Sequence, residues 1–510
     1  MLKDWLHELQ YTLLQGSVDE KVNEVIYDSR KAAPGAVFVC MAGTRVDSHD
    51  FIPQVLAAGV RVLVVERPVP APKDITVIQV KQGREALAVL SAARFEYPAK
   101  KLLMIGITGT KGKTTTAHMV RAILEASGKK TGIIGTNGVS FGEEHYPTVN
   151  TTPESYSLHQ YFARMVEAGC QCCVMEVSSQ ALKMYRVAGL HFDYSVFTNI
   201  SPDHIGPDEH ASFEEYLYYK KQIFAQSGFA LINIEDEHVG EITRDISCAW
   251  EGFGMNDPAR YQAEDIHYVS EPDFVGLEFT IQDSDGKRVA DVTNVDSRIP
   301  VRVNIPGKFN VSNALAASAV CLKAGVSKAA LCHALEHLRL DGRMEIVYTS
   351  EKFCVIVDYA HNAVSMESLL STLREYHPNR LVCVFGCGGN RSKDRRYSMG
   401  EIAGKMADFS IITADNSRFE KVEDIIGDIR GSIEKTGGKF TEIPDRRDAI
   451  TYSIHHAQTG DMIAIIGKGH EDYQEIEGVR YPFLDRAVVQ EAVSELLKKE
   501  AKNISERQNP

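Results

Sequence analysis

A glycine-rich run at residues 106–116 combines the residue types that bind a chain of phosphates. It reads Gly-Ile-Thr-Gly-Thr-Lys-Gly-Lys-Thr-Thr-Thr, and it follows an apolar segment, residues 102–105, that predicts a buried strand. It precedes residues 117–126, whose apolar positions recur at helical spacing. A glycine-rich turn at the start of a helix presents main-chain N–H groups and partial positive charge to an anion. The sequence therefore predicts an ATP site.

Lys113 and the threonines after it supply the side-chain chemistry of this loop. The Lys113 ammonium can reach terminal phosphate oxygens, and the hydroxyl of Thr114 or Thr115 can bind the Mg²⁺ that accompanies ATP. The spacing is unusual, because only Thr110 and Lys111 separate the two glycines of this loop, where the common phosphate loop has four residues. The alternative is a tight strand-to-helix turn in which Gly109 and Gly112 serve geometry alone.

Polar residues that directly follow predicted strands are further candidates, because ligands of open α/β sheets lie beyond the carboxyl ends of the strands. Glu176 follows one such strand, and His204 lies in a polar segment after the next. A carboxylate and an imidazole near an ATP loop can bind a second Mg²⁺. The alternative is that each is a surface residue or a helix cap.

The helix predicted around Lys220 gives this lysine no evident role. Ser212 opens the helix and Glu215 follows three residues later, which is the capping-box pattern. Lys220 lies beside an apolar stripe that includes Tyr216 and Phe224. On this pattern alone, Lys220 is a solvated residue whose alkyl stem covers the surface.

Three loops have two interpretations each. The Asn-Thr-Thr at residues 150–152 offers short donors for phosphate, or it is a turn in which Thr152 caps a helix with Pro153 in the first position. The Asp-Asn-Ser-Arg at residues 415–418 either pairs Arg418 with a substrate carboxylate or is a strand-end turn with a surface arginine. The Asp-Ser-Arg at residues 28–30 is equally ambiguous.

The composition indicates a large globular protein. A chain of 510 residues exceeds what one hydrophobic core organises, so we expect two to four domains. The formal charge of −13 argues against general binding to nucleic acid or to membrane surfaces. The sequence has neither a membrane-spanning apolar run nor a signal-peptide core, so we expect a cytoplasmic protein. Separately, we expect a monomer. The cysteine cluster at residues 170–173 lies in a predicted strand, which favours core cysteines over metal ligands.

The order of predicted elements indicates an α/β fold with mainly parallel sheets. Residues 1–98 carry short strands at 36–41, 60–65 and 76–80, and a proline at residue 98 closes this region. Residues 99–340 alternate strands and helices and include a β-rich stretch at 260–305. The region 341–510 is again α/β; its buried strands are predicted at 353–357, 381–385, 409–413 and 462–466.

Taken together, these motifs resemble the Mur ligases of peptidoglycan precursor synthesis, and most closely the branch that adds the third peptide residue. The resemblance covers nearly the whole chain, and the motifs occur in the family's order. They are the segments 28–30, 109–115, 150–152, 176–179, 198–204, 216–220, 307–313, 342–345, 358–361, 386–389, 415–418 and 467–471, together with Arg186.

The resemblance implies three domains: an N-terminal UDP-sugar-binding domain, a central P-loop-type ATPase domain and a C-terminal Rossmann-like domain that binds the incoming amino acid. It implies that ATP contacts come from two domains, so that closure completes the site. The implied ATP contacts are Gly109, Thr110, Lys111, Gly112, Lys113, Thr114, Thr115, Asn313, Arg343 and Asp358. The implied contacts of the UDP-sugar, its phosphates and its peptide are Tyr27, Ser29, Thr44, Arg45, Val46, Asn150, Thr151, Thr152, Ser178 and Arg186. The implied amino-acid contacts are Arg391, Asp415, Asn416, Ser417, Arg418, Gly467 and Glu471.

The resemblance also implies a modified lysine. Lys220 matches a lysine that is carbamylated in the family, which turns a cation into a carboxylate able to bind Mg²⁺. The implied catalytic residues are Lys113, Glu176, His204 and Lys220, and the metal ligands are Thr114, Glu176, His204 and the Lys220 carbamate. The expected cofactor is Mg²⁺, with ATP as co-substrate.

The implied reaction is ligation of meso-diaminopimelate to UDP-N-acetylmuramoyl-L-alanyl-D-glutamate through an acyl phosphate. The family's usual Asp-Asn-Pro-Arg has Ser417 in place of proline here, and lysine-adding relatives lack the arginine. Arg418 therefore favours an amino acid with a distal carboxylate. The alternatives are the same ligation with L-lysine or another diamino acid, a folate or cyanophycin ligase, and a catalytically silent paralogue that binds nucleotide.

Overall fold

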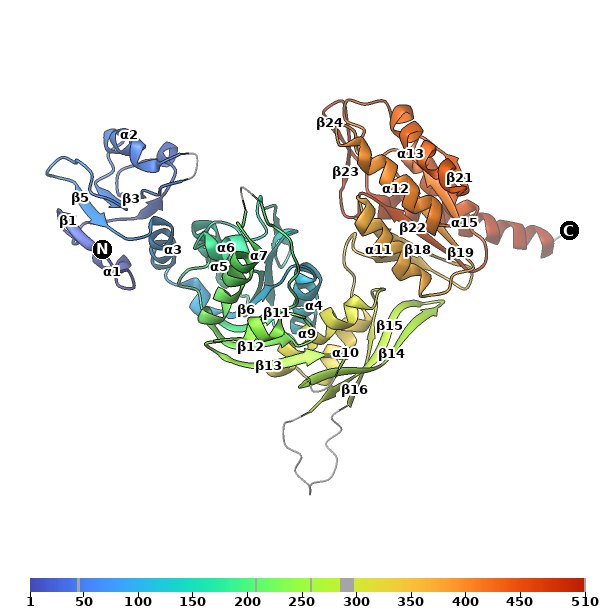
Figure 1. The fold of residues 1–510 in the computed structure, drawn as a ribbon, viewed down its shortest axis with the longest axis horizontal. Helices are drawn as coiled ribbons and strands as arrows, with labels where there is room; N and C mark the ends of the chain where they lie inside the picture. Colours follow the sequence, from blue (N-terminus) through green and yellow to red (C-terminus); the bar gives the residue numbers. More distant parts are fainter. Residues whose placement is uncertain (44–45, 207–208, 257–258, 285–297, 509–510) are drawn as a thin grey trace, which may run out of the picture. The chain divides into compact units, whose positions relative to one another are not determined.

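The computed structural model describes residues 1–43, 46–206, 209–256, 259–284 and 298–508, which form two compact units. The first unit consists mainly of Met1–Gln262 and Ser312–Leu331, and the second mainly of Ala263–Ile281 and Cys332–Pro510. Both units carry sheets of largely parallel strands with flanking helices, so the predicted α/β class is confirmed (Figure 1). The domain bounds at residues 98/99 and 340/341 stay predictions.

The first unit begins with a five-stranded sheet. Its strands are β1 (Thr12–Gln15), β2 (Glu24–Ile26), β3 (Ala36–Val39), β4 (Val62–Val65) and β5 (Thr76–Gln79). Their order is β1-β5-β4-β3-β2, and only β1 is antiparallel to its neighbour. The sequence predicts β3, β4 and β5 correctly and misses β1 and β2, because β1 is largely exposed and β2 is too short to form an apolar run.

The phosphate-binding run belongs to a second sheet of the first unit. Its strands are β6 (Leu103–Thr108), β7 (Thr131–Gly135), β8 (Gly138–Phe141), β9 (Glu144–Tyr146), β10 (Cys172–Glu176), β11 (Phe192–Phe197), β12 (Ser227–Asn233) and β13 (Ala249–Gly254). These eight are consecutive members of an eleven-stranded sheet, in the order β13-β12-β11-β6-β10-β7-β8-β9; the β7–β8 and β8–β9 pairs are antiparallel and the other pairs among them are parallel. β6 lies between β10 and β11, with Glu176 opposite Ile107 and Phe197 opposite Thr108. The segments that follow these three strands therefore meet at one edge.

Helices flank both sheets of the first unit. They are α1 (Leu2–Trp5), α2 (Ile52–Ala57), α3 (Gly83–Arg94), α4 (Lys113–Ala126), α5 (Ser155–Glu167), α6 (Ser179–Lys183), α7 (Phe213–Lys221) and α8 (Val239–Thr243). Short 3₁₀ turns lie at η1 (Ser29–Lys31), η2 (Ser48–Phe51), η3 (Pro98–Lys101) and η4 (Gln222–Gln226). The predicted start of α7 is confirmed, because the Ser212 hydroxyl accepts from the N–H of Glu215.

The β-rich stretch predicted near residues 260–305 is present. It contains β14 (Tyr261–Glu271), β15 (Phe274–Asp283) and β16 (Arg298–Val303), followed by helices α9 (Phe309–Lys323) and α10 (Lys328–Glu336). Burial alternates along β16, as expected for a strand with one exposed face.

The second unit holds a six-stranded sheet. Its strands are β17 (Glu345–Thr349), β18 (Phe353–Asp358), β19 (Arg380–Phe385), β20 (Phe409–Ile412), β21 (Phe440–Glu442) and β22 (Asp461–Ile466). Their order is β17-β18-β22-β19-β20-β21, and only β17 is antiparallel. The loops after β18, β22 and β20 therefore emerge at one edge, and all four strands predicted here are confirmed. A hairpin of β23 (Tyr473–Ile476) and β24 (Val479–Pro482) follows β22.

Two groups of helices cover this sheet. Helices α11 (Ala363–Arg374), α12 (Lys393–Met406) and α13 (Val422–Thr436) pack in series, and α14 (Arg446–His455) packs on α15 (Asp485–Gln508). The strands between them, such as β18 and β22, consist of nearly continuous apolar residues, because both faces of a parallel sheet are buried. No helix in the described part of the chain is long and apolar enough to span a bilayer. The cysteines at 170, 172 and 173 are buried, as predicted for core residues.

A buried ion pair joins α14 to α15. The guanidinium of Arg446 donates to both oxygens of Asp485, at 2.8 and 2.7 Å, and neither side chain is exposed. The same guanidinium donates to the carbonyls of Ala414, at 3.2 Å, and Ile466, at 3.0 Å. Arg446 therefore ties the ends of β20 and β22 to α15.

We expect Asp485→Ala to destabilise the second unit by about 3–5 kcal/mol, because it leaves the Arg446 charge buried without its counter-ion. Hydrogen exchange of the β20 and β22 amides, followed by mass spectrometry, measures this change. Glu491→Ala is the matched control: it removes the exposed partner of Arg447, and we expect a loss of about 0–1 kcal/mol. Equal losses in the two variants would contradict the tie between the strand ends.

Candidate functional site

The loop between β6 and α4 has a backbone that only glycine fits at two positions. Gly109 has a φ of 145°, and a Cβ there would lie 2.0 Å from Thr198 Oγ1. Gly112 has a φ of 86°, and a Cβ there would lie 2.3 Å from Asn313 Oδ1. The segment after β11 supports the loop from the side, because Asn199 Oδ1 accepts from the N–H of Lys111 at 2.9 Å. The glycine spacing, although unusual, thus builds the tight loop before a helix that phosphate binding requires.

Lys113 lies folded back over this loop. Its ammonium donates to the carbonyls of Gly109, at 3.0 Å, and Thr110, at 3.1 Å. Burial lowers the pKa of Lys113, although the nearby carboxylates of Glu176 and Asp203 oppose the shift. A phosphate chain in the loop would satisfy this cation better than two neutral carbonyls do.

Glu176 is the buried acid of the site. Thr114 Oγ1 donates to it at 3.0 Å from each carboxylate oxygen, and the N–H of Thr136 donates to Oε1 at 2.9 Å. Burial raises the pKa of Glu176, while the Thr136 N–H and the charge of Lys113 oppose the shift. A hydroxyl and a carboxylate in contact are hard oxygen ligands of the kind that Mg²⁺ binds.

The solvated interpretation of Lys220 is wrong. Its side chain is buried, with 1% of the residue exposed, and its ammonium donates to the carbonyl of Gly109 at 2.7 Å. Burial lowers the pKa of Lys220 well below the usual 10.5, and the neighbouring charge of Lys113 lowers it further. Tyr216, in the apolar stripe of α7, is fully buried, and the centre of its ring lies 4.7 Å from the Lys220 ammonium. Lys220 is therefore buried together with the stripe.

His204 is placed less favourably for metal binding. Its side chain is half exposed, and its Nδ1 lies 2.8 Å from Glu209 Oε1. The described residues include no group of three or more aspartate, glutamate, histidine or cysteine side chains placed to hold a metal ion. The role of His204 as a ligand stays a prediction.

The Asn-Thr-Thr segment is not the helix cap that the sequence allows. Helix α5 begins at Ser155 with Glu154 as its N-cap, whereas Thr152 is buried. Thr152 Oγ1 donates to the carbonyl of Glu176 at 2.8 Å, and Arg186 donates to the carbonyl of Thr152 at 3.1 Å. The structure thus brings Thr152, Ser178 and Arg186 beside Glu176, since Ser178 donates its N–H to Thr152 Oγ1 at 3.1 Å. Thr151 contacts Thr136 at 3.1 Å, and Asn150 is exposed.

Three other proposed UDP-sugar contacts, Tyr27, Ser29 and Val46, follow strands β2 and β3 of the first sheet. Tyr27 is partly buried, and burial raises the pKa of its hydroxyl. Ser29 opens η1 after Asp28, whose pKa the Arg30 guanidinium lowers to about 2. Val46 is exposed. Thr44 and Arg45 lie outside the described residues.

The remaining proposed ATP contacts fall in both units. Asn313 lies beside the loop in the first unit, where Thr116 Oγ1 donates to its Oδ1 at 3.4 Å. In the second unit, Asp358 accepts from the N–H groups of Met344 and Ala360, each at 2.7 Å, and burial raises its pKa. Arg343 lies over the ring of Tyr359, 5.0 Å from its centre. The ATP roles of all three residues stay predictions.

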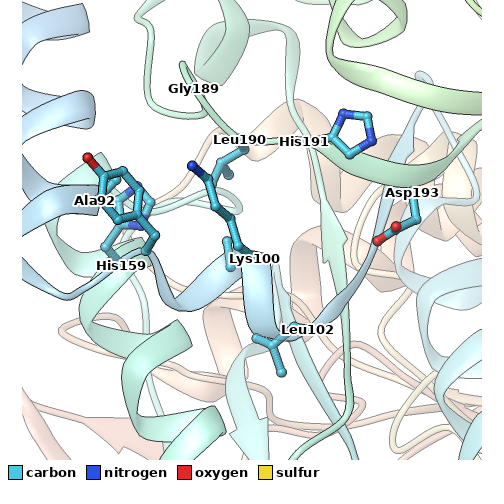
Figure 2. Close-up of a pocket in the computed structure, with 10 residues that line it drawn as sticks. Ala92, Lys100, Leu102, His159, Gly189, Leu190, His191 and Asp193 are labelled. Atoms are coloured by element: carbon cyan, nitrogen blue, oxygen red, sulfur yellow. The ribbon is translucent and has the colours of Figure 1, made fainter. Parts of the chain in front are cut away.

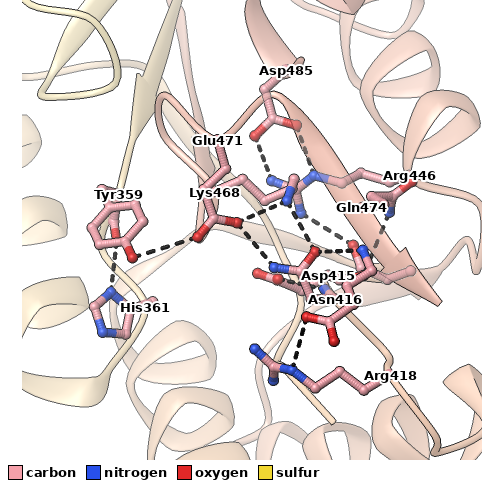
Figure 3. Close-up of polar contacts among 12 residues, drawn as sticks. Tyr359, His361, Asp415, Asn416, Arg418, Arg446, Lys468, Glu471, Gln474 and Asp485 are labelled. Carbon is pink, nitrogen blue, oxygen red and sulfur yellow. Dashed lines mark hydrogen bonds and ion pairs between the residues drawn. The ribbon is translucent and has the colours of Figure 1, made fainter. Parts of the chain in front are cut away.

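Four of the proposed amino-acid contacts, Asp415, Asn416, Arg418 and Glu471, lie near one another at the edge of the six-stranded sheet of the second unit (Figure 3). Asn416 Nδ2 donates to Glu471 Oε2 at 2.9 Å, and Gly467 has a φ of 115° directly after β22.

Arg418 donates through Nε to Glu475, at 3.3 Å, and through Nη1 to the carbonyl of Gly389, at 2.8 Å. Its main chain bonds to that of Glu475 and Glu477 on the hairpin. Arg418 is therefore held in place rather than loose on the surface. Asp415 and Ser417 are buried in the same loop, and Arg391 lies exposed on the loop after β19.

Sequence reasoning misses four residues of these sites: Thr136, Arg446, Lys468 and Glu475. Thr136 contacts Glu176 through its N–H, at 2.9 Å, and through its hydroxyl, at 3.3 Å, and it stands outside the motifs noted in the sequence. Lys468 stands between two glycines inside a noted motif, so its position after a buried strand could have drawn attention.

A separate cavity of about 230 Å³ lies elsewhere in the first unit (Figure 2). Its lining includes Lys100, His159, His191 and Asp193. Burial lowers the pKa of His159 to about 4, so this imidazole is neutral at physiological pH. None of the proposed site residues lines this cavity, which therefore does not belong to the phosphate loop.

Three family models match the chain. Residues 107–321 match the Mur ligase middle domain, residues 342–469 the glutamate ligase domain of Mur ligases, and residues 21–95 the catalytic domain of the Mur ligase family. The chain belongs to the Mur ligase family of ATP-dependent ligases, as its motifs predicted, and it has the three-domain fold of that family.

Known ligases of nearly equal length are similar to this chain from end to end. A UDP-N-acetylmuramoyl-L-alanyl-D-glutamate--2,6-diaminopimelate ligase of Clostridium perfringens is 37% identical over 96% of this chain and 98% of its own. The ligase of the same name from Geobacillus kaustophilus is 39% identical over 92% and 94%. A solved structure of a ligase with this name superposes with a TM-score of 0.73 at 28% identity, over 93% of this chain and 95% of the other.

We expect the burial of Lys220 to make the stability of the first unit depend on pH. The unfolded chain holds the proton of this lysine up to about 10.5, whereas the folded chain releases it at lower pH. Between the two pKa values the unfolded state binds more protons, so the free energy of unfolding rises with pH by about 1.4 kcal/mol per unit.

Lys220→Met should reduce this slope and leave the part that the lowered pKa of Lys113 contributes, measured by urea unfolding in CO₂-free buffer. Tryptophan fluorescence suits the measurement because both tryptophans, Trp5 and Trp250, lie in the first unit. The exposed Lys405→Met is the control and should retain the slope. A slope that Lys220→Met leaves unchanged would contradict the assignment of the shift to this lysine.

Proposed function

We propose that this ligase joins 2,6-diaminopimelate to the glutamate of UDP-N-acetylmuramoyl-L-alanyl-D-glutamate with ATP, acting as a monomer in the cytoplasm, where ATP and UDP-sugars are made. The observation that carries the proposal is a glycine loop that lies with Lys113, Thr114 and Glu176 at one edge of its sheet. The chain that contains it is similar over its length to 2,6-diaminopimelate ligases. Arg418, at the edge of the six-stranded sheet of the second unit, supports the choice of an amino acid with a distal carboxylate.

The chemical problem is that a carboxylate is a poor electrophile, because oxide is a poor leaving group. An oxygen of the substrate carboxylate attacks the γ-phosphorus of ATP, ADP leaves, and an acyl phosphate forms. The amine of the incoming amino acid then attacks the carbonyl carbon, loses a proton, and expels phosphate to leave the amide. Phosphoryl transfer depends mainly on positioning and on charge stabilisation, which are the tasks of the loop.

Within this reaction, Lys113 neutralises charge on the transferring phosphoryl group. The main-chain N–H groups of the loop and the N-terminus of α4 hold the phosphates in line. Thr152, Ser178 and Arg186, which lie beside Glu176, would orient the peptide end of the UDP-sugar and so its carboxylate. Glu471 would accept from the ammonium at the distal end of the amino acid, and Arg418 and the amide N–H of Asn416 would bind its distal carboxylate.

Mg²⁺ belongs to this proposal. The contact between Thr114 and Glu176 provides hard oxygen ligands, and His204 and a carbamate on Lys220 are the further proposed ligands. When bound, the ion supplies Lewis-acid charge that stabilises the transferring phosphoryl group.

The carbamate follows from the chemistry of a buried lysine. Since burial lowers the pKa of Lys220, its amine is available in the neutral form at lower pH than an exposed lysine. A neutral amine adds to CO₂, forms an N–C bond and releases one proton, which leaves an anionic carbamate. The new anion would lie beside Lys113 and relieve the repulsion between two buried cations.

We expect amino-acid-dependent release of ADP from ATP and the UDP-muramoyl dipeptide, with diaminopimelate faster than L-lysine. Lys113→Ala should reduce the rate by at least about a thousandfold, because the transferring charge loses its cation. A coupled assay for ADP measures both rates. If lysine outpaces diaminopimelate, the amino-acid assignment is wrong. If neither releases ADP, the chain is a silent nucleotide-binding relative.

We expect Lys220→Ala to lower the rate by about a hundredfold and added acetate or formate to restore part of it, because a small carboxylate can occupy the place of the carbamate. The control is sodium chloride at equal ionic strength. Full activity of Lys220→Ala without additive, or equal effects of acetate and chloride, would refute the carbamate.

A further inference from the structure

Lys468 is a fully buried cation at the edge of the six-stranded sheet of the second unit. It follows β22 in the sequence Gly-Lys-Gly-His-Glu, and its side chain has no exposed surface. Figure 3 shows its ammonium between the side chains of Asn416 and Glu471. A charged group without solvent must be satisfied by protein atoms, so its contacts reveal what it holds.

The loop geometry explains why this lysine is buried. Gly467 has a φ of 115°, and a Cβ there would lie 2.6 Å from Asp415 Oδ2. Gly469 has a φ of 54°, and a Cβ there would lie 2.8 Å from the Cβ of Tyr359. The two glycines let the loop pass between the segments that follow β20 and β18. The lysine between them is thereby enclosed among those segments.

The contacts of Lys468 form a closed triangle. Its Nζ donates to Asn416 Oδ1 at 3.2 Å and to Glu471 Oε2 at 3.0 Å, and Asn416 Nδ2 donates to Glu471 Oε2 at 2.9 Å. An ammonium has only donors, so it fixes the amide of Asn416 with its oxygen towards Lys468 and its nitrogen towards Glu471. The N–H of Glu475 donates to the same amide oxygen at 2.9 Å, which reinforces this orientation.

The triangle leaves specific atoms for a ligand. Glu471 Oε2 already accepts two hydrogen bonds, whereas Oε1 has, among the described residues, only a 3.5 Å contact with the hydroxyl of Tyr359. Oε1 is therefore the oxygen able to accept from an incoming ammonium, and the second N–H of the Asn416 amide is the matching donor to a carboxylate. Arg418 leaves the same β20 loop and supplies the cation for that carboxylate.

We propose that Lys468 is a positioning residue for the incoming amino acid: it holds Asn416 and Glu471 in the arrangement that receives a ligand carrying an ammonium and a carboxylate on one carbon. This inference rests on the proposed function and deepens it. Lys468 does not touch the reacting atoms. It acts through the two side chains that contact the amino acid.

The test compares Lys468→Met and Lys468→Gln with wild type in the full-length enzyme. We expect KM for diaminopimelate to rise at least about tenfold, because a buried carboxylate and amide lose their common partner. KM for ATP and for the UDP-muramoyl dipeptide should stay within about twofold, since Lys468, Asn416 and Glu471 are not among the proposed contacts of either substrate. Lys468→Arg keeps the charge and the donors and should recover most of the loss. The exposed Lys405→Met on α12 is the matched control and should match wild type.

A double-mutant cycle separates positioning from general structural support. In the Glu471→Gln background, Lys468→Met should raise KM for diaminopimelate by less than about threefold, because the group it positions has already changed. Full multiplication of the two effects, an equal rise in all three KM values, or no rise in KM for diaminopimelate would each overturn the proposal. A wild-type enzyme inactive with diaminopimelate would instead refute the proposed function.

Discussion

Two buried ammonium groups share one carbonyl oxygen, and the site depends on this contact. Lys113 and Lys220 both donate to the carbonyl of Gly109, at 3.0 and 2.7 Å. A neutral carbonyl is a weak partner for two cations out of water, and burial accordingly lowers the pKa of both lysines. The arrangement becomes favourable when an anion arrives, which a triphosphate supplies and which a carbamate on Lys220 would supplement.

The fold creates this contact by bringing strand ends together. β6 lies between β10 and β11, so the glycine loop, Glu176 and Asn199 emerge at one edge, and α7 brings Lys220 to the same loop. The second unit follows the same rule, where loops after β18, β20 and β22 surround Lys468. In both units, parallel strands bury the charged groups at their carboxyl ends, and such groups remain stable only with fixed partners.

Much of this could be predicted from the sequence, because phosphate loops and buried parallel strands have local signatures. The glycines and Lys113, the buried strands of both units and the ordered Mur ligase motifs are of this kind. The burial of Lys220 could not be predicted from periodicity, since a lysine beside an apolar stripe is usually solvated. The network around Lys468 arises from residues far apart in the sequence, and β1 was missed because an exposed strand has no apolar run.

The central claim is that this charge cluster transfers a phosphoryl group to a carboxylate. The most direct measurement starts from a UDP-muramoyl dipeptide with ¹⁸O in the reacting carboxylate and follows the label by mass spectrometry after one turnover. The account predicts that one ¹⁸O appears in inorganic phosphate, because the attacking oxygen leaves with the phosphoryl group. Label in AMP, or unlabelled phosphate accompanying amide formation, would contradict it.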